Sequence, residues 1–209
     1  MDSILTAAEL VVAWTGGLAA AATLAAILAG FYRSDTRQAG ARTGPGARFL
    51  RWPILAAATL LWIGIGVALW QPLPFILGTW ERWAALAAGG ALLFGGMALY
   101  WWGFRTLGEM FGAASGFGVR LYATHRLVTN GPYAVIRHPM YLGVIMAFAG
   151  SILVYRTWAC VLYALMVVGL PVRARAEDRA LAGAFGEEWE RYRRRVPGWV
   201  PRLSRKQGG

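Results

Sequence analysis

The sequence predicts an all-α, polytopic membrane protein with about five transmembrane helices and a cytoplasmic, amphipathic C-terminal helix. Three observations support this prediction. Apolar residues make up 57% of the 209 residues, which is more apolar surface than a soluble domain of this size can bury. These residues gather in five long runs. The arginines lie between or after the runs, as the positive-inside rule describes for membrane proteins.

The apolar runs approach the length of about 20 residues that a helix needs to cross a bilayer. Residues 10–32 and 83–104 carry no charge and are long enough. Residues 52–80 are also uncharged, but Pro72 and Pro74 predict that their helix ends near Trp70. Residues 139–155 and 157–172 are shorter and are separated by Arg156 alone. They predict a tight helical hairpin that either spans fully or stops short of the far surface.

The charges of the connections predict the orientation. Five arginines follow the first run against one aspartate, whereas the N-terminal leader and the connection after residue 80 are poor in arginine. We therefore expect the N-terminus outside, and residues 105–137 and the tail after residue 172 in the cytoplasm. The abundance of Ala, Gly and Arg is typical of a GC-rich bacterial genome, so we expect the protein in a bacterial inner membrane. Residues 34–46, which contain three glycines and a proline, predict a flexible loop.

Several other classes of protein are disfavoured. The formal net charge of +11 is best explained as membrane-anchoring charge and not as a nucleic-acid surface. The single cysteine, Cys160, excludes a disulfide framework, and His125 and His138 lack partners at the spacing of metal ligands. We expect one domain over residues 1–209, with the motifs that bear on chemistry in residues 105–201.

A polar segment that a membrane anchor does not need precedes the fourth run. Residues 124–143 read THRLVTNGPYAVIRHPMYLG. The Asn-Gly-Pro sequence predicts a turn, and Pro139 suits the first position of a helix that follows an extended His138. The N-terminus of that helix, with Arg137 beside it, is suited to a carboxylate or phosphate group. Alternatively, Arg137 and His138 only mark the membrane interface and pair with lipid phosphates.

An acidic pair, Glu177-Asp178, stands at the end of the fifth predicted helix among several arginines. If the hairpin is antiparallel, the fifth helix returns to the level where the fourth began, so Glu177 is predicted to lie near Pro139. The alternative is an ordinary ion pair on the helix surface between Arg173 and Glu177, which are four residues apart.

The tail carries a second helical pattern. Phe185, Trp189, Tyr192 and Val196 recur at helical spacing, with Glu and Arg residues four apart between them. This pattern predicts an amphipathic helix that packs on the membrane surface or covers the site.

Two motifs resemble a known family. The stretch LVTNGPYAVIRHPMYLG resembles the signature of the isoprenylcysteine carboxyl methyltransferase family, and its PMYLG core is similar to phospholipid N-methyltransferases. The tail adds Glu177-Asp178, Leu181, the sequence FGEEW at 185–189 and a closing stretch with two prolines. The resemblance implies a methyltransferase that uses S-adenosyl-L-methionine at the cytoplasmic membrane face. The implied acceptor is lipid-borne or a small hydrophobic molecule, with membrane lipids around it and no nucleic acid or metal as partner.

The resemblance also implies the residues of the site. Arg137 and Glu177 are the implied catalytic residues. Arg137, His138 and Tyr141 are implied to line the cofactor, and Glu177 to bind polar groups of its ribose or amino end. Asp178 stands where the family commonly has Glu, and its side chain is one methylene shorter. The full implied cofactor-binding set is His125, Leu127, Val128, Gly131, Tyr133, Arg137, His138, Pro139, Tyr141, Glu177 and Asp178.

Two rival functions remain at this point. The first is an NADPH-dependent membrane reductase of the related steroid reductase type, but those proteins resemble a pattern with an acidic residue close after the glycine, where this chain has Val144. A dinucleotide fingerprint is also missing from the sequence. The second is a non-enzymatic scaffold or transporter subunit, although no apolar run carries an ionisable residue near its middle. The acceptor stays open between a small thiol, a free isoprenoid acid and a lipid amine.

Overall fold

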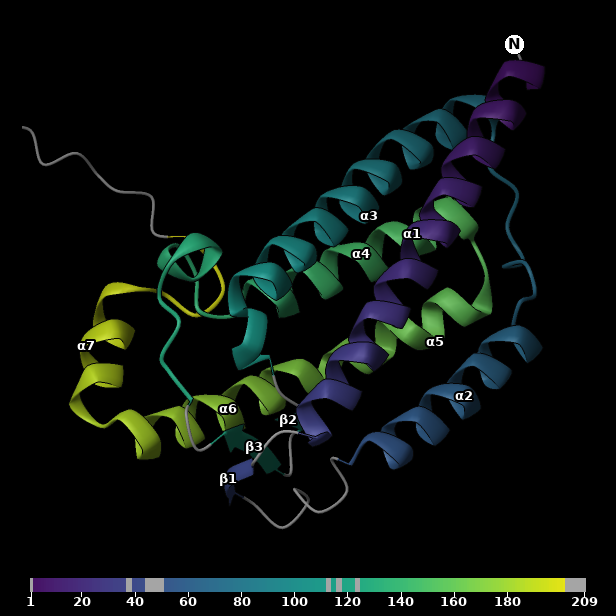
Figure 1. Cartoon of the computed structure of the whole chain (residues 1–209). Coiled ribbons are helices and arrows are strands. Elements are labelled where there is room, and N and C mark those ends of the chain that lie inside the picture. The colour runs from purple at the N-terminus through teal and green to yellow at the C-terminus, as the bar shows by residue number, and fades with distance from the viewer. Residues whose placement is uncertain are drawn as a thin grey trace, which may run out of the picture.

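The computed structural model describes residues 2–36, 39–43, 51–111, 114–115, 118–122 and 125–201, and it is mainly helical (Figure 1). Three of its helices, α1, α3 and α4, form the main bundle, and α6 and α7 extend past one end of it (Figure 1). The helices are α1 (Asp2–Thr36), α2 (Trp52–Ala68), α3 (Thr79–Leu107), α4 (Pro139–Tyr155), α5 (Trp158–Met166), α6 (Leu170–Phe185) and α7 (Glu187–Arg195). Short 3₁₀ turns occupy Gly108–Met110, Gly131–Ala134 and Val167–Gly169.

Three helical stretches are long and apolar enough to cross a membrane: Asp2–Arg33, Thr79–Met110 and Trp158–Phe185. Helices α2 and α4 are apolar but shorter. The first four predicted runs all form helices, and α4 has the predicted bounds. The number of these helices that cross the bilayer stays a prediction.

The hairpin between α4 and α5 forms as predicted, and its turn is tight. Arg156 adopts a left-handed conformation with φ of 50° directly after α4. The fifth apolar run, residues 157–172, covers α5 and the start of α6, and the helical region does not stop where the run ends. A 3₁₀ turn joins α5 to α6, and the helical stretch continues to Phe185. Pro171 is tolerated because it stands at the start of α6, where its missing N–H group costs no helical bond.

Glycines bring α3 and α4 into close contact. Gly89 and Gly96 on α3 face Gly143 and Gly150 on α4. A methyl group added at Gly96 would lie 2.5 Å from the carbonyl oxygen of Gly143, so any larger residue would force the helices apart. Small residues at such contacts are the usual means by which membrane helices pack closely. The packing places the first turn of α4 beside the last turns of α3, which is where the candidate site lies.

A small three-stranded sheet accompanies the helices without changing the all-α class that the sequence predicts. Strands β1 (Ala39–Thr43), β2 (Ala114–Ser115) and β3 (Gly118–Tyr122) pair antiparallel in the order β1-β3-β2. Strand β1 lies within the predicted flexible loop, of which residues 37–38 and 44–46 are outside the described residues. The segments after α1 and after α3 meet at the same end of the bundle, and pairing satisfies their backbone groups.

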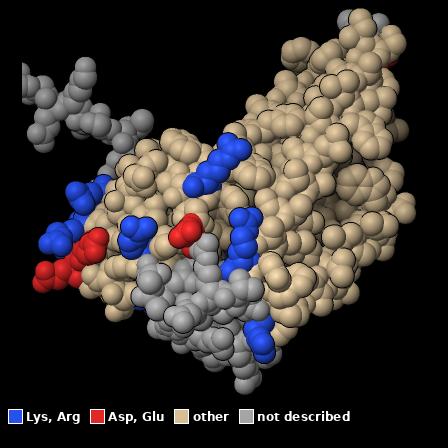
Figure 2. All heavy atoms as spheres, viewed as in Figure 1, with Lys and Arg blue, Asp and Glu red and all other residues tan. Residues whose placement is uncertain are grey.

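The two ends of the bundle differ in charge. Figure 2 shows charged side chains gathered over the end that carries α6 and α7, whereas the surface over α1 and α3 is almost free of charge. At the opposite end, Glu9 of α1 accepts hydrogen bonds from Arg82 of α3 at 3.2 Å and from Arg156 at 2.9 Å. This ionic cluster ties α1 to α3 and to the α4–α5 turn.

Candidate functional site

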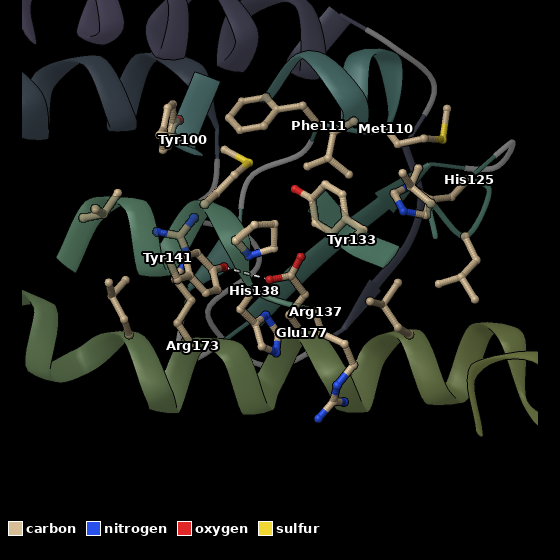
Figure 3. Close-up of a pocket in the computed structure, with 18 of the residues that line it drawn as sticks. Tyr100, Met110, Phe111, His125, Tyr133, Arg137, His138, Tyr141, Arg173 and Glu177 are labelled. Atoms are coloured by element: carbon tan, nitrogen blue, oxygen red, sulfur yellow. Dashed lines mark hydrogen bonds between the residues drawn. The ribbon is translucent and has the colours of Figure 1, made fainter. Parts of the chain in front are cut away.

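A cavity of about 240 Å³ opens at the end of the bundle that carries α6 and α7 (Figure 3). Its walls come from α1, α3, α4, α6 and α7 and from the segment between α3 and α4. Since an apolar cavity of about 150 Å³ already binds benzene, this space can hold an organic group. Elements from both halves of the chain therefore converge on one ligand-sized cavity.

A carboxylate and a guanidinium reach this cavity from neighbouring turns of α6. Glu177 accepts a hydrogen bond from the Tyr141 hydroxyl of α4 at 2.7 Å. The Arg173 guanidinium lies over the ring of Tyr141, 5.3 Å from its centre (Figure 3). The described residues contain no ion pair between Arg173 and Glu177, so the surface-pair alternative is not what the structure has. Glu177 turns instead toward the N-terminal part of α4, as the antiparallel hairpin predicted.

The second acid of the pair has a different place. Asp178 Oδ2 accepts a hydrogen bond from Arg137 Nη1 at 2.8 Å, and Asp178 Oδ1 lies 3.1 Å from His138 Nε2. The Arg137 guanidinium also stacks over Trp189 of α7 at 5.5 Å. Asp178 thus fixes Arg137 and His138 from outside the cavity, and only Glu177 faces into it.

Polar atoms in this region are left without partners. Among the described residues, the buried Nε atoms of Arg137 and Arg173 have no hydrogen-bond partner. Leaving a buried donor unsatisfied costs free energy, about 1–3 kcal/mol each. Both arginines line the cavity. The cost is removed when a polar ligand accepts these donors, which makes the pocket suited to a ligand with anionic groups.

The opposite wall of the cavity is apolar. Phe31 of α1 stacks on Phe111 at 5.7 Å, and Phe104 of α3 meets Phe111 edge-on at 4.8 Å. Figure 3 shows Tyr100, Met110 and Phe111 across the cavity from α6. The cavity therefore has a charged wall and an apolar wall, and the apolar wall adjoins the longest apolar helices.

Burial changes the proton affinity of groups around the cavity. It lowers the pKa of His125 below its ordinary value of 6.5, while the negative charge of Glu177 opposes this shift. Burial raises the pKa of Tyr133 well above 10, and Glu177 adds to that shift. Burial also raises the pKa of Tyr192 to about 12. The Tyr192 hydroxyl donates to the Tyr133 carbonyl at 2.7 Å, which attaches α7 to the turn before α4.

Most of the predicted site residues come together in the structure, whereas two stand outside the cavity. Gly131 does not line it but forms the predicted turn with φ of 55°, packed against Thr106. Asp178 acts through Arg137 and His138, as described above. The predicted residues that line the cavity are His125, Leu127, Val128, Tyr133, Arg137, His138, Pro139, Tyr141 and Glu177.

Sequence reasoning missed a larger set of lining residues. Those from α1 and α3 carry no motif, and Arg173 had the simpler explanation of a surface pair. The helix with Trp189 and Tyr192 was predicted to pack on the membrane surface or to cover the site, and the spacing of its aromatic residues was the signal for their place here. The missed residues are Ile27, Phe31, Tyr100, Leu107, Met110, Phe111, Arg126, Met140, Val144, Leu170, Arg173, Leu181, Trp189 and Tyr192.

Residues 85–183 match the model of the isoprenylcysteine carboxyl methyltransferase (ICMT) family. The match confirms the resemblance to this family that the two motifs predicted, and it covers the α3–α4 pair, the hairpin and most of α6. The likeness to phospholipid N-methyltransferases stays a prediction.

Relatives in several organisms are similar over this part of the chain. The cobalt-zinc-cadmium resistance protein CzcN of Cupriavidus metallidurans is 39% identical over 84 residues, which are 39% of this chain and 38% of that protein. Protein-S-isoprenylcysteine O-methyltransferase of Schizosaccharomyces pombe is 33% identical over 37% of this chain and 34% of its own. Methanethiol S-methyltransferase 2 of Bradyrhizobium diazoefficiens is 39% identical over 34% of this chain and 27% of its own.

The matched part therefore spans little more than a third of the length of these relatives, or less. Among solved structures, that of the eukaryotic intramembrane Ras methyltransferase ICMT, without a monobody, aligns with a TM-score of 0.49 at 20% sequence identity. The alignment covers 71% of this chain and 53% of that one.

Proposed function

We propose that this protein is a membrane methyltransferase that uses S-adenosyl-L-methionine and transfers a methyl group to a lipid-borne or small hydrophobic acceptor. The observation that carries the proposal is the two-walled cavity, most of whose lining residues lie in the segment that matches the methyltransferase family. A charged wall suits a zwitterionic cofactor, and an apolar wall suits the acceptor. Relatives with this segment bear the names of O- and S-methyltransferases.

The charged wall fits the polar groups of this cofactor. The unsatisfied Nε of Arg137 is suited to its carboxylate, and Glu177 to its ammonium group or ribose hydroxyls. The aromatic face of Tyr141 favours positive charge, as the position of Arg173 over it illustrates. Asp178 and Trp189 hold Arg137 in place from the side away from the cavity.

The cofactor supplies a methyl group activated by a positively charged sulfur. The protein's part is then to align the acceptor, exclude water and leave no strong competing nucleophile at the site. An acceptor that is already an anion, such as a carboxylate or thiolate, needs no base, and Arg173 offers it an uncommitted donor at the apolar end of α6. An amine must first lose a proton, for which Glu177 and His138 are the nearby bases.

Binding of the purified protein to two cofactors tests this proposal. Calorimetry in detergent or nanodiscs should detect heat of binding with S-adenosylhomocysteine or S-adenosylmethionine. It should detect no heat of binding with NADPH. Binding of NADPH alone would overturn the methyltransferase assignment in favour of the reductase. A chain that binds neither ligand would support the scaffold alternative. Incubating membrane extracts with methyl-labelled cofactor and analysing the products by mass spectrometry would then identify the acceptor.

We also propose that the cavity faces the cytoplasm and the N-terminus faces outward. The charged surface at the cavity end supports this orientation, because positively charged ends of membrane proteins stay in the cytoplasm (Figure 2). On a Cys160→Ala background, an impermeant thiol reagent should label Ile76→Cys in intact cells and leave Val200→Cys unlabelled until the cells are permeabilised. Both positions are exposed. Labelling of Val200→Cys in intact cells would place the cavity on the outer face.

A further inference from the structure

The chain crosses back over the start of α4 after α7. We call residues 196–199 the strap. The backbone N–H of Arg137 donates to the Pro197 carbonyl at 2.9 Å, and that of His138 donates to the Gly198 carbonyl at 3.1 Å. Val196, at the beginning of the strap, is buried with Trp189 and Tyr192 of α7. The strap is therefore anchored at one end by α7 and paired along its length with the two residues before α4.

The side chain of Trp199 completes a cluster of three rings. Its ring lies 5.4 Å from that of His138 and 6.3 Å from that of Tyr141, and the rings of His138 and Tyr141 are 5.6 Å apart. All three pairs are within the range in which aromatic rings attract one another. Trp199 does not line the cavity, whereas His138 and Tyr141 do. The ring of Trp199 can therefore act on a ligand through these two rings.

Gly198 allows this close crossing. A methyl group added there would lie 3.4 Å from Arg137 Nη2 and 3.9 Å from His138 Cδ2. The strap thus passes directly beside the guanidinium that Asp178 and Trp189 hold.

We propose that Trp199 is a positioning residue: it fixes the rings of His138 and Tyr141 so that the Tyr141 hydroxyl stays on Glu177. The inference rests on the proposed cofactor site. Tyr141 has two side-chain torsions, and only a narrow range of them brings its hydroxyl within 2.7 Å of Glu177. With Trp199 against it, the tyrosine is held in that range before a ligand arrives. Preorganisation of this kind raises affinity because less freedom is lost on binding.

The two histidines of the chain provide a direct test of the contact. In protein labelled with ¹³C-histidine, NMR should show two sets of ring signals, from His125 and His138. Trp199→Leu keeps an apolar side chain but removes the ring current, so the His138 signals should shift while those of His125 stay. Unchanged His138 signals would overturn the proposed contact. This measurement needs no cofactor, so its outcome is independent of the proposed function.

The positioning role is tested by affinity for S-adenosylhomocysteine. Trp199→Leu loses two aromatic contacts, so its affinity for S-adenosylhomocysteine should be about tenfold lower than that of the wild type. Trp199→Phe keeps a ring, and its affinity should stay within about threefold of the wild type. The matched control is Trp80→Leu, at an exposed tryptophan at the opposite end of α3, which should bind as the wild type does. Wild-type affinity in Trp199→Leu would overturn the inference. Absence of binding by the wild type would instead overturn the proposed cofactor, and the NMR result would still decide the contact.

Discussion

The two ends of the helical bundle both carry arginine and glutamate side chains, but the side chains that line the cavity pair differently from those at the end where α1 begins. At the end where α1 begins, the Glu9 carboxylate is shared by Arg82 and Arg156, and each guanidinium has its partner. At the cavity end, Arg173 and Glu177 lie one turn apart on α6 and form no ion pair with each other among the described residues. Arg173 keeps a buried Nε without a partner.

We interpret this difference as one between charges that stabilise the fold and charges that bind a ligand. A carboxylate shared by two arginines from other helices satisfies its charges and stabilises the packing of those helices. Charges that are close but unpaired lower the stability of the fold, and they are retained where a ligand completes them. We infer that removing a charge at the α1 end should affect stability, and removing one at the cavity end should affect binding. The following variants test this separation.

The largest expected effect is at Glu177. Glu177→Gln keeps the size of the side chain and removes the charge, and a charge-assisted hydrogen bond contributes about 1.5–3 kcal/mol. Affinity for S-adenosylhomocysteine, measured by calorimetry, should fall roughly tenfold or more. Glu187→Gln, on the exposed side of α7, is the matched control and should bind as the wild type does. Equal, small effects in both variants would remove Glu177 from the proposed site.

The reverse pattern is expected at Glu9. Glu9→Gln leaves Arg82 and Arg156 without their common anion, so the free energy of unfolding should fall by about 1–2 kcal/mol. Thermal unfolding in detergent measures this, with Glu188→Gln on the exposed surface of α7 as control. Affinity for S-adenosylhomocysteine should stay within about twofold of the wild type. A large loss of affinity without loss of stability would contradict the separation of the two ends.

Those parts of the fold that depend on local sequence were predictable. The bounds of α4 follow from Pro139 at its first turn and from the polar residue, Arg156, that ends its apolar run. The pairing of β1 with β3 was not predictable, because it joins segments about 80 residues apart with no local signal for strands. The continuation of the last helical stretch to Phe185 does not follow from the apolar run, because polarity, which marks the end of a membrane span, does not mark the end of a helix.

The site divides in the same way. Motif residues such as Tyr141 and Glu177 were predicted by resemblance. The antiparallel hairpin predicted that Glu177 lies near Pro139, and the structure has Glu177 bonded to Tyr141 in the same first turn of α4. Phe31 was missed because every face of α1 is apolar, so periodicity cannot tell which side meets protein and which meets lipid. Arg173 was missed because its spacing from Glu177 also fits a surface ion pair, and only coordinates separate the two arrangements.

Helix α1 runs between the two ends of the bundle, so variants at its two ends give a third test of their separate roles. Its C-terminal part contributes Phe31 to the apolar wall, so acceptors with one headgroup and increasing chain length should bind more tightly, by up to ~0.8 kcal/mol per buried methylene. Phe31→Ala should weaken this dependence, whereas Glu9→Gln on the same helix should leave it unchanged. Turnover measured over the series gives the apparent affinities. Turnover by the wild type that does not depend on the chain length of the acceptor would indicate a small, water-soluble acceptor.

The smallest expected effect is a dependence of stability on pH at the cavity end. Burial lowers the pKa of His125 below 6.5 in the folded protein, so the unfolded chain takes up a proton that the folded chain does not. The stability from the neutral ring is therefore complete above pH 6.5 and is lost as the pH falls below it. His125→Gln should lose less thermal stability than the wild type between pH 7.5 and pH 5.5. Glu177→Gln should lose more, because the carboxylate that favours protonation of His125 is gone. Identical pH profiles for all three proteins would show that His125 and Glu177 do not share an electrostatic environment.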